Sequence, residues 1–215
     1  AALLTLAQYY TQPAVAAILQ KHKAYLIVDI ANEALYHNWT GDINAAADRY
    51  VNTYSAIIND LRNNGFDFPL MLDAPDCGTD IALFNTAAAV LMAADSKHNL
   101  IFSAHAYWYS YANNNSATMA SLITAAASLN YPVILGEFGN YQDDANPCQY
   151  ALNYTALLHI CETYHFPWIG WSWDNDNCNA RQMSTNGNYN SLSAYGNDVI
   201  NNTYYGLKYK AERSP

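Results

Sequence analysis

The segment 132–139 reads Pro132-Val133-Ile134-Leu135-Gly136-Glu137-Phe138-Gly139. Three branched apolar residues in a row predict a strand that is buried on both faces, as in a parallel sheet. Glu137 follows where this strand ends, between two glycines that allow the backbone to turn sharply. Taken alone, a carboxylate at such a position is more often a helix cap or an ion-pair partner than a reactive group. The role of Glu137 therefore has to be judged together with the residues at the ends of the other predicted strands.

A strand that ends in a polar or aromatic residue recurs along the chain. Apolar runs predict strands at 24–31, 68–73, 99–107, 132–137 and 167–173, and their ends carry Glu33, Asp73, His105, Glu137 and Trp171. Helical patterns predict helices at 1–23, 44–64, 80–95, 117–129, 148–164 and 193–201. A spacing of somewhat more than about 30 residues between strands is typical of right-handed βαβ units. Functional residue types at the carboxyl ends favour an α/β fold, a (β/α) barrel of the TIM type. The rival is a doubly wound sheet, but no Gly-rich phosphate-binding motif follows any strand.

The length limits this barrel. A complete barrel has eight strands and about 250 residues, and only five strands can be found in these 215 residues. We therefore predict a single domain, residues 1–215, folded as a partial barrel truncated to about five βα units. Its strand edges at 24–31 and 167–173 and its uncovered apolar interior would be association sites. We expect a homo-oligomer or a complementing chain to cover them. The alternative is that loops and the first helix close the opening and leave a broad cleft.

Composition excludes several classes of partner. Nine Lys and Arg stand against 18 Asp and Glu, a net charge of −9, so the chain cannot neutralise the phosphates of a nucleic acid or bind an anionic membrane surface. No apolar run reaches the roughly 18 residues of a membrane helix. The first residues lack the basic start of a signal peptide, which is therefore absent or already removed. Abundant tyrosine, tryptophan and asparagine suit sugars, and four Asn-X-Ser/Thr triplets, at Asn38, Asn114, Asn153 and Asn201, favour a secreted protein.

Cysteines and acidic loops indicate no metal site. Cys77, Cys148, Cys161 and Cys178 have no CxxC spacing, which argues against zinc, and they allow three disulfide pairings. The oxygen-rich loops 143–144 and 174–177 are interpreted as solvated loops rather than as a calcium site. No cofactor is predicted.

Two glutamates at strand ends suggest a chemistry. Glu33 and Glu137 would face each other across the mouth of a barrel, and a pair of carboxyl groups is what glycoside hydrolysis uses. His105 and Tyr107 project to the same side of their predicted strand, where Tyr107 could hydrogen-bond one carboxylate and keep it ionised. Trp171 and Trp173 likewise share one side of their predicted strand and would offer a flat surface to a sugar ring.

Four short motifs carry a family resemblance: Ile30-Ala31-Asn32-Glu33, His105-Ala106-Tyr107-Trp108, Gly136-Glu137-Phe138-Gly139 and Gly170-Trp171-Ser172-Trp173. Together they resemble glycoside hydrolase family 5, which contains endo-acting cellulases and mannanases with retaining (β/α)8 barrels. The segment around Asp73, Leu72-Asp73-Ala74-Pro75, resembles the fifth strand of the mannanase-like branch. The resemblance implies that the chain corresponds to the family's third helix through its eighth.

The resemblance also implies roles. Glu33 would be the acid/base and Glu137 the nucleophile of a double displacement, with carboxyl groups about 5–5.5 Å apart. Asn32 would contact a sugar hydroxyl, His105 and Tyr107 would position the carboxylates, and Trp171 would floor the subsite beside the scissile bond. The arginine that the family places by its nucleophile comes from early strands that have no counterpart here.

The predicted function is endo-hydrolysis of a β-linked polysaccharide, a β-glucan or a β-mannan. Two alternatives remain: a non-catalytic carbohydrate-binding remnant of the same fold, and an esterase-like hydrolase in a widened cleft. Against the esterase, the chain has no Gly-X-Ser-X-Gly motif. Cys148 and Cys178 fall in the loops after neighbouring predicted strands and are therefore the favoured disulfide.

Overall fold

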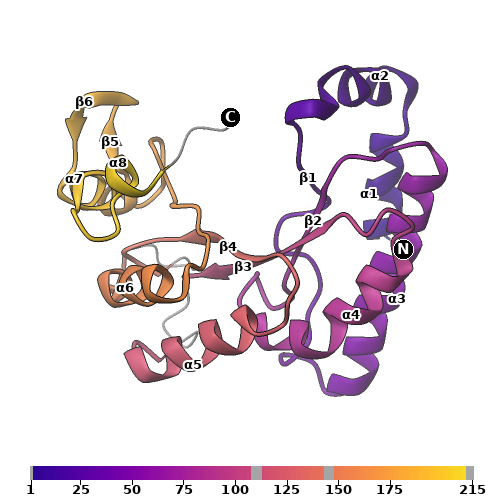
Figure 1. Cartoon of the computed structure of the whole chain (residues 1–215), viewed down its shortest axis with the longest axis horizontal. Coiled ribbons are helices and arrows are strands. Elements are labelled where there is room, and N and C mark those ends of the chain that lie inside the picture. Colours follow the sequence, from indigo (N-terminus) through magenta and orange to yellow (C-terminus); the bar gives the residue numbers. More distant parts are fainter. Residues whose placement is uncertain (1, 108–112, 143–147, 212–215) are drawn as a thin grey trace. The chain divides into compact units, whose positions relative to one another are not determined.

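A computed structural model describes residues 2–107, 113–142 and 148–211 (Figure 1). Trp108, from the second sequence motif, and the acidic loop 143–144 lie outside these ranges. The chain divides into two compact units, each described by itself here. Unit 1 comprises Ala1–Ala104 with Leu129–Val133, and unit 2 comprises His105–Ser128 with Ile134–Pro215. The strands of the main sheet follow one another in the order β1-β2-β3-β4.

Unit 1 alternates helices with parallel strands. It contains α1 (Ala2–Tyr10), α2 (Pro13–His22), β1 (Val28–Asp29), α3 (Ile43–Asn63), β2 (Leu70–Asp73), α4 (Phe84–Ala94) and most of β3 (Leu100–Ala106), with 3-10 turns at Lys23–Tyr25 and Ile81–Leu83. β1 pairs with β2, and β2 with β3, both in parallel register. Parallel strands joined by helices place all strand ends of one kind along one edge of the sheet. That edge carries Asp73 and the segment that begins at Ile30.

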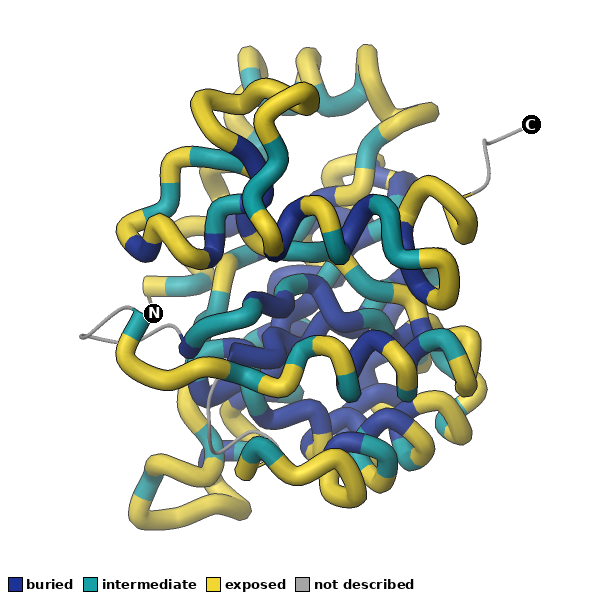
Figure 2. The backbone as a smooth tube through the Cα atoms, turned by 90° about the vertical axis from the view of Figure 1, so that its left-hand side faces the viewer, coloured by how far each residue is buried: buried dark blue, intermediate teal, exposed yellow. Residues whose placement is uncertain are grey.

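The core of unit 1 is built on one face of α3. Buried positions recur at helical spacing along it, at Ala46, Tyr50, Tyr54, Ile57, Ile58 and Leu61. This helix packs against both α1 and α4. In Figure 2 buried and exposed stretches accordingly alternate along the helical coils.

A buried ion pair connects the end of α3 to the residue that follows α4. Arg62 contacts Asp95 with Nε–Oδ1 at 2.7 Å, and its Nη1 donates to the carbonyl groups of Phe66 and Phe68. Both charged side chains are almost fully buried. Because one guanidinium satisfies several buried acceptors, Arg62 links α3 to the turns that lead into β2 and β3.

Unit 2 contains the remaining elements: α5 (Ser116–Ala127), β4 (Val133–Phe138, apart from its first residue), α6 (Tyr154–Tyr164), a 3-10 turn at Asn179–Arg181, the hairpin β5 (Ser184–Thr185) and β6 (Asn188–Leu192), α7 (Ala194–Asn201) and α8 (Leu207–Lys210). Helices α5 and α6 lie side by side (Figure 1). Asp198 on α7 accepts hydrogen bonds from Tyr154 at 2.9 Å and Tyr205 at 2.6 Å, which ties α7 to α6.

The predicted (β/α) fold class is confirmed, with three local differences. The strand predicted at 24–31 is reduced to Val28–Asp29, because residues 23–25 form a 3-10 turn. The helix predicted at 148–164 begins at Tyr154, where the Asn153 side chain caps it. Of the strand predicted at 167–173, the described residues keep one bridge to β4, between Leu135 and Trp168.

The irregularity of segment 167–173 has a visible cause. The Ile169 amide donates to Leu135, but the Trp171 amide then donates to Phe138 instead of to Glu137. This one-residue slip breaks the regular parallel ladder. Since two-residue alternation holds only in a regular strand, the argument that Trp171 and Trp173 share one side does not apply here.

The hairpin β5–β6 was not predicted, although the sequence contains its signal. Asn186 and Gly187 both have positive φ, 53° and 67°. An Asn-Gly pair with φ positive at both positions is the preferred two-residue hairpin turn.

Candidate active site

In unit 2, three predicted site residues come together at the ends of β3 and β4. The Tyr107 hydroxyl donates to Glu137 Oε2 at 2.7 Å, and His105 Nδ1 lies 3.8 Å from the same oxygen. His105 and Tyr107 are buried, whereas the Glu137 side chain keeps 20% of its surface exposed. The carboxylate of the predicted nucleophile is therefore held by Tyr107 while its side chain stays partly exposed.

The electrostatics of this cluster fix its hydrogen-bond direction. Burial, and then the neighbouring Glu137 carboxylate, raise the pKa of Tyr107 far above that of a free phenol. Tyr107 therefore remains a protonated donor at any working pH. A donor held 2.7 Å from the oxygen favours the ionised carboxylate, the form that a nucleophile requires.

An arginine that the sequence analysis did not single out covers Tyr107. The guanidinium carbon of Arg181 lies 5.5 Å from the centre of the Tyr107 ring. A cation in this position is attracted by the face of the ring. Arg181 comes from the 3-10 turn at 179–181, so a positive charge stands beside the tyrosine that holds Glu137 although no early strand supplies it.

Asp176 is the partner of Arg181. Its Oδ1 lies 2.8 Å from Arg181 Nη2, and each side chain is only 2% exposed. Burial alone would raise the pKa of Asp176, but the hydrogen bonds from Arg181 and from the Cys178 amide outweigh it and hold this pKa below its usual range. The loop 174–177 was interpreted as solvated; for Asp176 this is wrong, because its carboxylate is buried in an ion pair.

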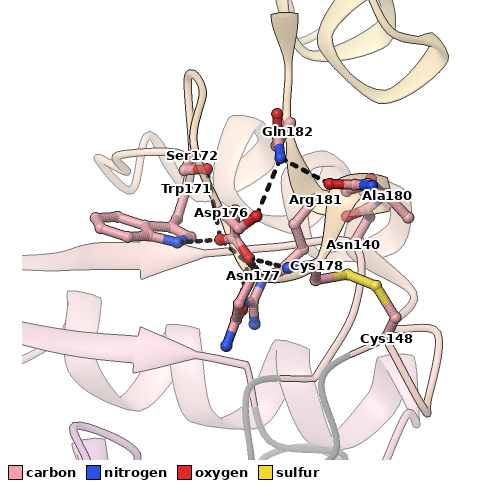
Figure 3. Close-up of a disulfide and its surroundings, with 11 residues drawn as sticks. Asn140, Cys148, Trp171, Ser172, Asp176, Asn177, Cys178, Ala180, Arg181 and Gln182 are labelled. Atoms are coloured by element: carbon pink, nitrogen blue, oxygen red, sulfur yellow. Dashed lines mark hydrogen bonds and ion pairs between the residues drawn. A yellow bond between two sulfur atoms is a disulfide. The ribbon is translucent and has the colours of Figure 1, made fainter. Parts of the chain in front are cut away.

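The same aspartate orients Trp171. Its Oδ2 accepts from Trp171 Nε1 at 2.6 Å, and its Oδ1 accepts from the Cys178 amide at 2.6 Å (Figure 3). Cys148 and Cys178 form a disulfide, with Cα atoms 5.4 Å apart, which confirms the favoured pairing. The disulfide anchors the residue at the end of this loop. Trp171 is thus a fixed indole with 43% of its surface exposed.

Trp173 has different partners. Its Nε1 donates to the Gly187 carbonyl at 3.1 Å, and its ring stacks on Tyr189 of β6 with centroids 6.5 Å apart. It also lines a small pocket of about 260 Å³ with Trp168 and Met183. The structure therefore attaches Trp173 to the hairpin and Trp171 to Asp176.

In unit 1, the predicted acid/base stands on an unusual backbone. Glu33 has φ +53°, a left-handed conformation that non-glycine residues rarely adopt. Its amide donates to Asp73 Oδ2 at 3.0 Å, and Asp73 is fully buried at the end of β2. Strained residues that a rigid neighbour holds in place are concentrated at functional sites. Asp73 is thus placed as a support for Glu33.

Asn32 is exposed beside Glu33. It lines a pocket of about 660 Å³ in unit 1, together with Leu3 and Leu6 of α1 and Arg49 of α3. Glu33 belongs to unit 1 and Glu137 to unit 2. The spacing of about 5–5.5 Å between the two carboxyl groups that a retaining mechanism requires stays a prediction.

Comparison with known proteins identifies the family. The model of the family described as cellulase (glycosyl hydrolase family 5) matches residues 5–177. The chain belongs to glycosyl hydrolase family 5. Family 5 membership confirms the resemblance that the four motifs carry.

Curated relatives include two mannan endo-1,4-beta-mannosidases. The protein from Cellvibrio japonicus is 32% identical over 83% of this chain, and the one from Streptomyces lividans is 28% identical over 82%. The chain spans about two fifths of their length, 39% and 43% respectively.

Solved structures of beta-mannanases have a fold similar to that of this chain. The beta-mannanase from Thermomonospora fusca superposes with a TM-score of 0.79 at 26% identity, covering 98% of this chain and 65% of that one. The beta-mannanase from Streptomyces thermolilacinus reaches a TM-score of 0.80 at 22% identity, covering 99% and 66%, and supports the fold. Among the described residues, no helix is long and apolar enough to span a membrane.

Proposed function

We propose that the protein is an endo-acting retaining glycosidase that cleaves a β-linked polysaccharide, with β-mannan as its substrate. The observation that carries the proposal is the 2.7 Å hydrogen bond from Tyr107 to Glu137, made at the end of a buried parallel strand. It favours an ionised carboxylate on a side chain that keeps 20% of its surface exposed. A carbohydrate-binding remnant has no use for such a carboxylate.

The residues act as follows in this proposal. Glu137 attacks the anomeric carbon and the bond to the leaving oxygen breaks, while Glu33 gives its proton to that oxygen. Glu33 then takes a proton from water, which displaces Glu137 and restores the original anomeric configuration. Tyr107 and His105 position Glu137, and Asp73 positions Glu33. Asn32 and Trp171 contact the sugar.

The choice of mannan is supported by the relatives. The two mannan endo-1,4-beta-mannosidases and the beta-mannanase from Thermomonospora fusca are similar to this chain over more than four fifths of its length. Glucan is the competing substrate, because a family 5 chain with these motifs also resembles cellulases.

The test uses one variant and one matched control. Glu137→Gln keeps the size of the side chain and removes the nucleophile, so hydrolysis of β-mannan by the protein should fall to background. Glu162→Gln changes an acidic residue of α6 in the same unit, which pairs with Lys210, and should leave the rate unchanged. NMR of the first product should show the β-anomer. An equal loss in both variants, or a first product of inverted configuration, would refute the mechanism. Binding of mannan without cleavage by the unaltered protein would favour the remnant.

Two further proposals concern the protein as a whole. A secreted protein is supported by the Cys148–Cys178 disulfide, since such bonds persist in oxidising compartments. A second copy or a complementing chain would pair the edge strand β1. Light scattering should then give a mass above the 23.9 kDa of one chain, and a stable monomer at micromolar concentration would contradict this.

A further inference from the structure

Two large aromatic side chains stand exposed on the loop that follows Glu33. Tyr36 and Trp39 are 56% and 52% exposed, and their ring centres lie 5.8 Å apart with the planes inclined by 31°. Single exposed aromatics are common on protein surfaces, but two in contact form an apolar patch. Neither ring belongs to the core of unit 1. Each ring therefore presents more than half of its surface at the outside of unit 1.

The loop that carries the pair is rigidly held. Asp76 is buried, and its two carboxylate oxygens accept from the amides of His37 at 2.7 Å and Asn38 at 2.8 Å. The Asp76 amide donates in turn to the Leu35 carbonyl at 3.1 Å. His37 Nδ1 lies 2.6 Å from Asp80 Oδ2. A buried aspartate thus fixes the backbone between the two aromatic residues, and the loop is built to hold its shape.

Three of the side chains that hold this loop also have the types and spacing of metal ligands. His37, Asp76 and Asp80 bring one ligand atom each within 4.8 Å of one another. The hydrogen bonds above already account for that arrangement, because each of the three side chains has a protein partner in it. The cluster is therefore explained as a support for the loop.

The chemistry of the patch matches a sugar chain. A pyranose presents a flat face of C–H groups with hydroxyl groups at its rim, and two inclined rings offer it an apolar surface. The loop begins three residues after Glu33, so a polysaccharide whose scissile bond lies at Glu33 runs close to it.

We propose that Tyr36 and Trp39 form a sugar-binding platform that holds a hexopyranosyl unit of the polysaccharide away from the cleavage point. The proposal rests on the proposed function for the identity of the ligand. The platform adds a contact that only an oligosaccharide long enough to reach it can make. It therefore increases the affinity for long oligosaccharides.

The test measures binding without hydrolysis. In the Glu137→Gln background, titration calorimetry with mannohexaose compares Tyr36→Ala, Trp39→Ala and Trp39→Tyr. Loss of one stacking ring should weaken binding roughly tenfold, from the usual worth of such contacts. Trp39→Tyr keeps a flat face and should retain most of the affinity. Tyr25→Ala removes a ring that is 95% exposed elsewhere in unit 1, and it should bind like the parent protein.

The outcomes separate this inference from the proposed function. If the unaltered protein cleaves mannan but both alanine variants bind mannohexaose as tightly as the parent, the platform is refuted and the function stands. If no glycan is cleaved but the alanine variants lose mannohexaose binding, the platform stands and the hydrolase fails. Equal weakening by Tyr25→Ala would also overturn the platform, because the effect would then be general.

Discussion

Replacing Arg181 by methionine tests how much the buried ion pair with Asp176 stabilises the folded protein. Both side chains are 2% exposed, so the variant leaves a buried carboxylate without its cation. Breaking a buried pair in this way costs about 3–5 kcal/mol. In a protein of this size each kcal/mol lowers the melting temperature by about 2–4 °C, so we expect a fall of roughly 6–20 °C.

A double-mutant cycle isolates the interaction. Unfolding in urea, followed by tryptophan fluorescence, is measured for the unaltered protein, Arg181→Met, Asp176→Asn and the double variant. Because the double variant removes both charges, it should be more stable than Arg181→Met alone, with a coupling energy of about 2 kcal/mol or more. Lys23 and Asp67 form an exposed pair in unit 1, and the same cycle there should show almost no coupling.

The pH dependence gives a second reading of the same cycle. The pKa of Asp176 lies below its unfolded value, so the stability that it contributes is present above the unfolded pKa of about 4 and is lost as the pH falls through the folded pKa. The difference in stability between the unaltered protein and Asp176→Asn should therefore shrink below about pH 4. Additive effects in the cycle, together with a difference that does not change with pH, would refute the reasoning.

Three further outcomes follow from the structure. Tyr107→Phe removes a charge-assisted hydrogen bond worth about 1.5–3 kcal/mol and should lower kcat on mannan roughly 10- to 150-fold. The acid limb of its pH–rate profile should move to higher pH, and an unchanged kcat would contradict the prediction. Gly196→Ala places a Cβ 1.9 Å from a backbone oxygen and should unfold the protein at a lower temperature than Gly41→Ala, where nothing lies within 4 Å; equal melting temperatures would contradict it. Replacing Cys148 and Cys178 by serine opens a link between residues 30 positions apart, which a chain-entropy model values at about 3.6 kcal/mol in urea unfolding; no loss of stability would argue against that model here.

Much of the fold could be predicted because its signals are local. The helical stripe of α3 and the apolar runs of β2, β3 and β4 are each encoded in one short segment of sequence. The proximity of His105, Tyr107 and Glu137 could also be predicted. His105 and Glu137 end parallel strands, whose carboxyl ends lie along one edge of the sheet, and Tyr107 was expected on the same side as His105. The structure joins those three as expected.

The rest depends on pairings between distant residues. Nothing local to Arg181 or Asp176 marks them as a buried pair, because their burial results from how the loop closes around Trp171 and Tyr107. The slip beside Phe138 likewise comes from tertiary hydrogen bonds and not from composition. The turn at Asn186-Gly187 is different, because an adjacent Asn-Gly pair is a local signal from which the hairpin could have been predicted.

Glu33 is a glutamate that its own backbone disfavours. A left-handed conformation costs a residue with a Cβ about 1–2 kcal/mol that glycine would not incur. A glycine at position 33 would therefore avoid this cost while removing the carboxyl group. In the proposed mechanism the carboxyl group of Glu33 is required for catalysis, so the chemistry and the backbone conformation make opposite demands on the residue at this position.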